Sequence, residues 1–289
     1  MAYGQHQSFY LRVRWLNKAL KQLQEDERFF YEQEAFEKIG LGKNMVQSLR
    51  FWVIATNVIE EKFNEERKKV HLLTEFGSLI YKYDRFVQFE ETVSILHYYL
   101  VTRQEPATAW YWFFNYFTEK VFTKDSLLNR FIEWVNQEEN KSVSEKSLKK
   151  DIDCLLKLYT ADPNVDDPEE VIRSPFDFLG LLVANDDYFY RYTPKNIHQT
   201  ALMYTLLYYA QENDISSVTI EEIETKIGLW GKAFNLDRTM IVNSLEKLID
   251  HPKYPIKFLR TNQLDTIRLP EVSPLDYLEF EYKRKMGNV

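Results

Sequence analysis

The sequence predicts a mainly α-helical protein in which multiple winged helix-turn-helix units surround an aromatic-rich helical core. Three observations predict this fold class. Glycine and proline are scarce, with 8 and 9 residues, which favours long helices over a sheet-rich fold. Aromatic residues make up 16% of the chain and are densest at residues 110–117. Near residue 40, a short helical pattern, a glycine turn, a longer helical pattern and two alternating stretches follow in the order of a winged unit.

Composition limits the function classes. The chain has 289 residues, enough for one large domain or two to three small ones. Charged residues make up 28% and apolar ones 45%, which excludes a disordered protein. The single cysteine, Cys154, can form neither an internal disulfide nor a cysteine-based zinc site. With no signal-peptide pattern and no apolar run of about 18 residues, we expect a cytoplasmic protein without a membrane partner.

The net charge of −7 is unfavourable for a nucleic-acid binder, because phosphate contacts are made by lysine and arginine. The charge is unevenly distributed, however. Residues 1–100 carry 14 basic and 14 acidic side chains and hold the densest basic cluster. If any part of the chain contacts DNA, we expect it to be this one.

Residues 1–104 are expected to form an N-terminal winged helix-turn-helix unit. Its helices are expected at residues 9–23, 27–39 and 43–56. The second of these ends at Gly40, a normal C-terminal cap residue. Alternating patterns at residues 58–63 and 69–73 predict two strands around a polar turn, which would form the wing.

Residues 105–162 are expected to form a central helical unit. Its first helix, at residues 108–122, is apolar nearly all round, which is typical of a buried packing element. Residues 127–135 and 144–159 predict a helix-turn-helix-like pair. Residues 161–168 contain two prolines and no periodicity, so they predict a linker.

Residues 169–289 are expected to form a C-terminal winged-helix-like unit. Helices are predicted at residues 200–212, 219–227 and from residue 235 or 237 to 250. Thr219 and Glu222 have the spacing of a capping box at the start of the second helix. Strand patterns at residues 256–260 and 266–269 again predict a wing.

Short motifs spread in order over nearly the whole chain indicate a family. They are GQHQSFYLRVRWLNK at residues 4–18, LGKNMV at 41–46, LTEFG at 73–77, LHYYL at 96–100, AWYWFFN at 109–115, KDID at 150–153 and SPF at 174–176. In these motifs the chain resembles a bacterial family catalogued as domain-of-unknown-function family 4007. The resemblance implies a genomic setting among genes of DNA phosphorothioation and antiphage defence, including sulfurtransferases and cysteine desulfurases. No catalytic residues are established for that family, so the resemblance implies none here.

The candidate nucleic-acid-binding residues come from the third helix and the wing. Lys43, Gln47 and Arg50 stand at positions i, i+4 and i+7, so one helical face can present all three. Arginine, asparagine and glutamine can bond base edges bidentately, and lysine meets phosphate. The full candidate set is Lys43, Asn44, Gln47, Ser48, Arg50, Arg67, Lys68 and Lys69. The alternative is that these residues form a solvated helix face and loop, and that the unit contacts protein.

Other candidate sites are weaker. Lys146, Lys149 and Lys150 could contact phosphate, but interleaved acids favour an ordinary exposed face. The glycines before Lys43 lack the spacing of a nucleotide-binding P-loop. The five histidines are scattered, and His97 has the surroundings of a core residue. We therefore expect no catalytic residues, no metal and no cofactor.

The sequence thus favours a non-catalytic DNA-binding protein of a bacterial DNA sulfur-modification (phosphorothioation) or antiphage defence system. Its expected partners are double-stranded DNA and proteins of that system, and a homodimer is left open. The alternative is a protein adaptor that recruits a sulfurtransferase or another modification or restriction enzyme. The sequence does not fix whether a base sequence or a phosphorothioate is recognised.

Overall fold

The computed structural model describes residues 1–160, 173–194, 197–261 and 264–287. In these ranges the α-helices are α1 (Val13–Glu25), α2 (Ala35–Ile39), α3 (Lys43–Ala55), α4 (Glu75–Tyr83), α5 (Glu90–Thr102), α6 (Thr108–Asn115), α7 (Lys124–Glu138), α8 (Glu145–Tyr159), α9 (Gln199–Glu212), α10 (Ile220–Thr225), α11 (Trp230–Ala233), α12 (Arg238–Ile249) and α13 (Pro274–Lys285). Short 3₁₀ turns lie at Phe29–Tyr31 and Asp177–Leu179. Within the described ranges, no helix combines the length and apolarity that crossing a bilayer requires.

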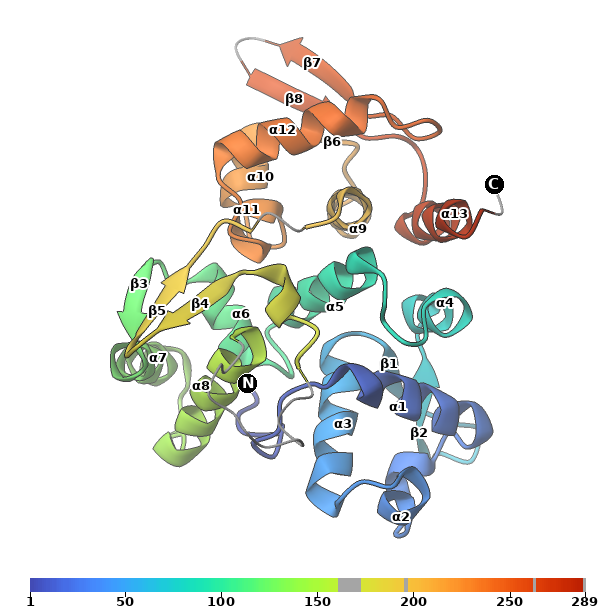
Figure 1. Cartoon of the computed structure of the whole chain (residues 1–289), viewed down its shortest axis with the longest axis vertical. Coiled ribbons are helices and arrows are strands. Elements are labelled where there is room, and N and C mark those ends of the chain that lie inside the picture. The colour runs from blue at the N-terminus through green and yellow to red at the C-terminus, as the bar shows by residue number, and fades with distance from the viewer. Residues whose placement is uncertain (161–172, 195–196, 262–263, 288–289) are drawn as a thin grey trace.

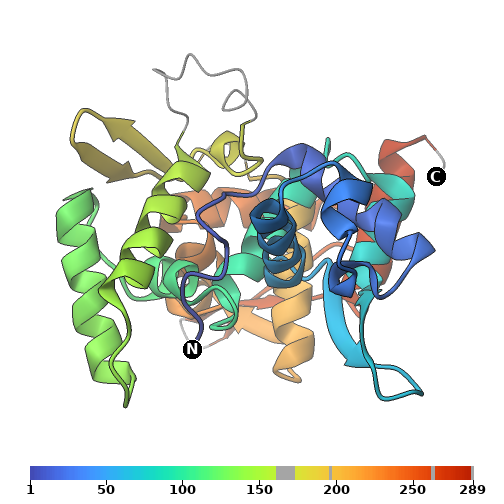
Figure 2. The same cartoon turned by 90° about the horizontal axis from the view of Figure 1, so that it is seen from below.

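Small antiparallel sheets complete the fold (Figure 1). The strands are β1 (Ile59–Phe63), β2 (Lys69–Leu73), β3 (Val121–Thr123), β4 (Leu182–Asn185), β5 (Tyr188–Arg191), β6 (Ser217–Thr219), β7 (Lys257–Thr261) and β8 (Leu264–Arg268). β1 and β2 form a hairpin, β3, β5 and β4 form one three-stranded sheet, and β6, β8 and β7 form another, each in that order. Figure 2 shows the β1–β2 hairpin projecting from the body of the molecule.

The prediction of a mainly α fold built from winged helix-turn-helix units is wrong. Of the residues that the structure describes, 54% are helical and 12% are in strands, an α/β mix. The expected DNA-reading helix, α3, is a core helix: seven of its 13 residues are buried. Trp52 on α3 packs edge-to-face on Trp110 of α6, with ring centroids 5.3 Å apart. A helix held in this way is one wall of the core, so the order of elements around residue 40 does not establish a winged unit.

The sequence did not predict strands β3, β4, β5 and β6. These strands are short, and β3 and β6 lead directly into helices. β3 and β6 have three residues each, and Thr123 and Thr219 at their ends already cap α7 and α10. Strands this short show no alternation in the sequence. The β4–β5 hairpin turns at Asp186, whose φ of 53° is left-handed. Aspartate tolerates that conformation, so neither glycine nor proline was needed to make the turn.

Several local predictions are confirmed. The strands expected at residues 58–63 and 69–73 pair as β1 and β2, with Ile59 opposite Leu73. The capping box of Thr219 and Glu222 is present at α10. Gly40 ends α2 in the left-handed conformation, at φ 66°. The helix expected at 27–39 is instead a 3₁₀ turn followed by the five-residue α2. The linker expected at residues 161–168 lies outside the described residues, and the division into three units stays a prediction.

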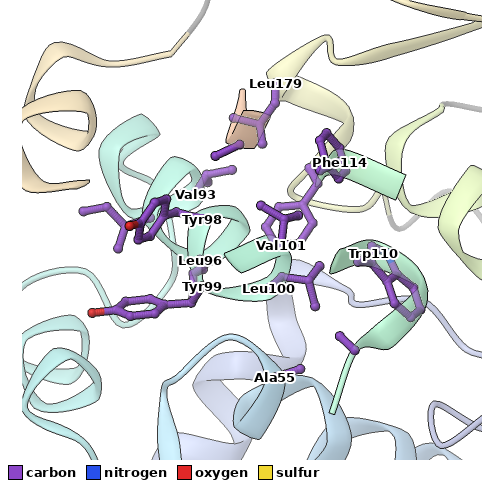
Figure 3. Close-up of a cluster of buried hydrophobic side chains, with 14 of the residues drawn as sticks. Ala55, Val93, Leu96, Tyr98, Tyr99, Leu100, Val101, Trp110, Phe114 and Leu179 are labelled. Atoms are coloured by element: carbon purple, nitrogen blue, oxygen red, sulfur yellow. The ribbon is translucent and has the colours of Figure 1, made fainter. Parts of the chain in front are cut away.

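The core centres on α5 and α6. The buried helix expected at residues 108–122 is shorter than predicted, because α6 ends at Asn115 and residues 121–123 form β3. Every residue of α5 from Glu91 to Val101 is buried. Figure 3 shows Leu96 and Leu100 of α5 with Trp110 of α6 on one side and Ala55 of α3 below them. Gly77 on α4 permits a close contact in this region, because a Cβ there would lie 1.9 Å from the Val58 carbonyl oxygen.

The N-terminal segment before α1 is tied to distant elements. The backbone N–H of Gly4 donates to both carboxylate oxygens of Asp151 on α8, at 2.9 and 3.1 Å. His6 is buried, and its Nε2 lies 2.9 Å from Asp151 Oδ1. The carbonyl of Phe9 accepts hydrogen bonds from Ser48 and Trp52 of α3. These contacts set the point at which α1 begins.

His97 is fully buried in the centre of α5, as the sequence indicated. Its Nε2 lies 2.7 Å from the Ala233 carbonyl oxygen and its Nδ1 lies 2.7 Å from the Tyr159 hydroxyl. Because a carbonyl oxygen only accepts, Nε2 carries the proton and Nδ1 accepts from Tyr159. Burial lowers the pKa of His97 to about 3.

We predict that His97 makes the protein acid-sensitive. Its pKa is about 6.5 in the unfolded chain, so only the unfolded state takes up a proton between pH 6.5 and about 3. The stabilising contribution is complete above pH 6.5 and is lost as the pH falls, by about 2 kcal/mol at about pH 5. Urea unfolding across this range should show a shallower pH dependence for His97→Gln than for the wild type. Equal slopes for both proteins would contradict the prediction.

Candidate nucleic-acid interface

The predicted residues at the start of α3 face solvent. Lys43, Asn44 and Gln47 are exposed. The helix begins directly after Gly42, whose extended backbone forms the N-terminal cap. The Lys43 ammonium lies 4.9 Å from the centre of the Phe36 ring on α2. This part of the predicted site is therefore available to a partner.

Ser48 lies in the core instead. It is fully buried, and its hydroxyl donates to the carbonyl oxygen of Phe9 at 3.1 Å. That bond joins α3 to the segment that leads into α1. The structure therefore gives Ser48 a role in positioning α1.

Arg50 is held by side chains of the hairpin and of the first 3₁₀ turn. Its Nη2 lies 2.6 Å from Glu61 Oε2. Its Nε donates to His71 Nε2 at 3.1 Å, and its guanidinium lies 4.9 Å from the centre of the Tyr31 ring. The charge of Arg50 is thus matched by a carboxylate within the same protein.

The hairpin cations are also largely paired. Lys69 Nζ lies 2.6 Å from Glu61 Oε1, and Lys68 Nζ lies 2.7 Å from Glu66 Oε2. Arg67, at the tip, is exposed and takes a left-handed φ of 57°. Within the described ranges no carboxylate forms an ion pair with Arg67. Of the three hairpin cations predicted to bind nucleic acid, Arg67 is therefore the one without an internal counter-charge in this part of the chain.

Glu61, Arg50, Lys69, Tyr31 and His71 form what we call the Glu61 cluster. Hydrogen bonds from Lys69 and from the Tyr31 hydroxyl hold the pKa of Glu61 down at about 2, so this carboxylate stays ionised. Burial, together with the charge of Arg50, lowers the pKa of His71 to about 4, so this ring stays neutral near pH 7. The cluster joins α3 to both strands of the hairpin and uses two of the predicted cations to do so.

A pocket of about 430 Å³ lies next to the cluster. Gln47 and Arg50 of the predicted site line it, together with Gln5 and Gln7 of the N-terminal segment and Phe30. The pocket therefore brings amide and guanidinium groups close to an aromatic ring. These groups can donate and accept hydrogen bonds, as contacts with base edges require.

Sequence reasoning left a second group of cations out of the site. Arg14, Lys18 and Lys21 stand at i, i+4 and i+7 on α1, so they share one helical face, which we call the α1 cation row. Among the described residues none of the three pairs with a carboxylate. Lys18 donates to the Ile39 carbonyl oxygen at 3.0 Å, which places the row beside the end of α2, just before Lys43. The signal in the sequence was the absence of any acidic residue from 9 to 24.

Among the described residues, no three histidine, cysteine, aspartate or glutamate side chains are grouped to hold a metal ion. Cys154 is buried on α8, and burial raises the pKa of its thiol well above the usual value. A thiol in that state is a poor nucleophile.

Comparison with known proteins supplies the family. Residues 3–282 match the family described as "Protein of unknown function (DUF4007)". The chain belongs to this family. None of the curated proteins matches the chain in sequence. Two solved structures are similar to it, "Magnesium ion-bound SspB crystal structure" and "SspB crystal structure". Each superposes with a TM-score of 0.84 at 22% identity, covering 99% of this chain and 88% of the other. At this identity the likeness shows a shared fold.

We predict that Glu61→Gln lowers the free energy of unfolding at pH 7, because Arg50 and Lys69 lose their carboxylate partner. The expected loss is about 1 kcal/mol, because the cluster is partly exposed and solvent screens its ion pairs. The folded pKa of Glu61, about 2, lies below its usual 4.5. The stabilising contribution of the ionised Glu61 is therefore complete above pH 4.5 and is lost as the pH falls towards 2. The difference in unfolding free energy between Glu61→Gln and the wild type should therefore shrink over that range. Glu60→Gln is the matched control, because among the described residues Glu60 forms its ion pair only with Lys62, at the surface. Equal urea-unfolding stabilities for the two variants at pH 7 would contradict the prediction.

Proposed function

We propose that this protein binds double-stranded DNA as a component of a bacterial DNA sulfur-modification or antiphage defence system. The setting rests on membership of the DUF4007 family and on the genomic neighbourhood that the family resemblance implies. The fold shared with the structures titled SspB is consistent with it. The binding role rests on the surface described above.

The observation that carries the proposal is the α1 cation row together with Lys43. Their ammonium and guanidinium groups have no carboxylate partner in the described ranges. They can therefore bind an anionic partner without first giving up an internal ion pair. Cations that neutralise DNA phosphates release condensed counterions, which supplies affinity that falls with salt. Asn44 and Gln47 lie beside Lys43 and can add contacts to base edges. Arg67 would reach the backbone from the hairpin tip.

The Glu61 cluster limits which residues take part. An arginine or lysine already paired with a carboxylate must exchange that partner for a phosphate, so its net gain is small. We therefore assign Arg50 and Lys69 a supporting role, in which they fix the hairpin against α3. In this proposal Lys68 contributes little to DNA binding, because it is paired with Glu66 at the same hairpin tip.

One observation favours the adaptor alternative. The paired hairpin also exposes apolar side chains: Phe63 is 68% and Leu72 is 37% exposed. Exposed aromatic and aliphatic groups beside balanced charges suit a protein partner better than a phosphate backbone. The hairpin would then recruit a modification enzyme.

The test removes three exposed cations. We predict that Arg14→Gln, Lys21→Gln and Lys43→Gln combined will weaken binding to duplex DNA at least about tenfold at low salt. The slope of log K against log salt should fall by up to about 2.7, because each lost phosphate contact is worth about 0.9. The melting temperature should not change, because these side chains are exposed. Fluorescence anisotropy over a salt series measures both quantities.

The matched control is Lys141→Gln, Lys146→Gln and Lys149→Gln combined, which makes the same change in net charge at exposed positions near and on α8. It should bind as the wild type does. Equal losses in both triple variants would show a non-specific charge effect and contradict the proposed surface. Absence of duplex binding by the wild type at low salt, with nuclease-resistant co-purification of an operon neighbour lost in Phe63→Ser, would establish the adaptor instead.

A further inference from the structure

A second pocket is lined by residues from the end of α6, from strand β5 and from α11. Figure 1 shows where these elements lie in the fold. The volume of the pocket is about 300 Å³. Three cations line it: Arg191 from β5, Lys232 from α11 and Lys120 from the loop before β3. The DNA-binding proposal uses none of these residues.

Arg191 is partly buried without a counter-charge. Its guanidinium donates to the Phe117 carbonyl oxygen and to Asn235 Oδ1, and lies 5.0 Å from the centre of the Phe113 ring. Both hydrogen-bond acceptors are neutral, and no described carboxylate forms an ion pair with it. Burial alone lowers its pKa, to about 10. A guanidinium has five N–H donors, so most of its capacity remains for a ligand.

Lys232 is also partly buried and has no counter-charge among the described residues. Its ammonium donates to the Asn115 carbonyl oxygen at 3.1 Å and, among described residues, pairs with no carboxylate. Two acids also line the pocket, and each already has another partner. Glu224 pairs with Arg238 at 3.3 Å, and Asp237 Oδ1 accepts from the backbone N–H of Met240 at 2.9 Å.

We propose that this pocket binds the phosphate group of a small phosphorylated molecule. Arg191 and Lys232 are partly buried, and their hydrogen bonds go only to neutral acceptors, so an anion that contacts both would be stabilised. Thr118 and Thr193 line the same pocket and can donate hydroxyl hydrogen bonds. The volume is at the low end for small-molecule sites, which suits a phosphate monoester the size of a mononucleotide, and Tyr192, which lines the same pocket, offers an aromatic ring to the base. The site does not depend on DNA binding.

The experiment is calorimetric titration of the full chain with sodium phosphate and with AMP, in sodium chloride buffer of matched ionic strength. Adenosine, which lacks the phosphate, is the ligand control. We expect saturable binding of AMP and phosphate and none of adenosine. Adenosine binding as tight as AMP, or no saturable binding of either phosphate compound, would overturn the proposal.

Variants locate the site. Lys232→Met keeps the length of the side chain and should weaken AMP binding by about tenfold, the effect of losing one charged contact. Lys141→Met, at an exposed position elsewhere, should bind AMP as the wild type does. Arg191→Gln should abolish binding, provided its melting curve shows a folded protein. Unchanged affinity in Lys232→Met would overturn the assignment, as would binding of an oligonucleotide with none of AMP.

Discussion

The fold depends on a buried polar contact between its first residues and α8. Asp151 is almost fully buried, and burial raises its pKa, because a charged carboxylate is costly away from water. His6 and the backbone of Gly4 supply the hydrogen bonds that this carboxyl group needs there. The same segment then bonds to α3 through Phe9. These contacts fix the segment that leads into α1, and the buried side chains of α1, among them Leu16 and Leu20, then pack it against α3, so that the α1 cation row lies beside Lys43.

Charge pairing then decides which cations are available to a partner. Arg50 and Lys69 sit within hydrogen-bond distance of Glu61, whereas the α1 cation row has no carboxylate partner in the described ranges. An exposed ion pair contributes only about 0–1 kcal/mol to stability. A cation in such a pair must nevertheless give up its carboxylate partner before it can bind a phosphate. Under the proposed function, this pairing therefore decides which cations can contact DNA. This explains how a chain with a net charge of −7 can still present a local basic surface.

Much of the local structure could be predicted from the sequence, because caps and periodicity are local. Gly40, the Thr219 capping box and the β1–β2 hairpin follow from neighbouring residues alone. The fold class could not, because whether α3 is a surface or a core helix depends on Trp110, far along the chain. The surroundings of the candidate site residues were hidden for the same reason: Ser48 is buried and Arg50 is paired with Glu61. Nothing in the spacing of Lys43, Gln47 and Arg50 indicates that Glu61 would face Arg50, or that Arg191 and Lys232 would share a pocket.

The most direct test of the account is lysine acetylation of the protein with and without duplex DNA, read residue by residue by mass spectrometry. If DNA binds the surface formed by α1 and the start of α3, it will protect Lys21 and Lys43, while the reactivity of Lys141, Lys146 and Lys149 is unchanged. Full reactivity of Lys21 and Lys43 in saturating duplex would contradict this binding, because the surface formed by α1 and the start of α3 would then lie outside the contact.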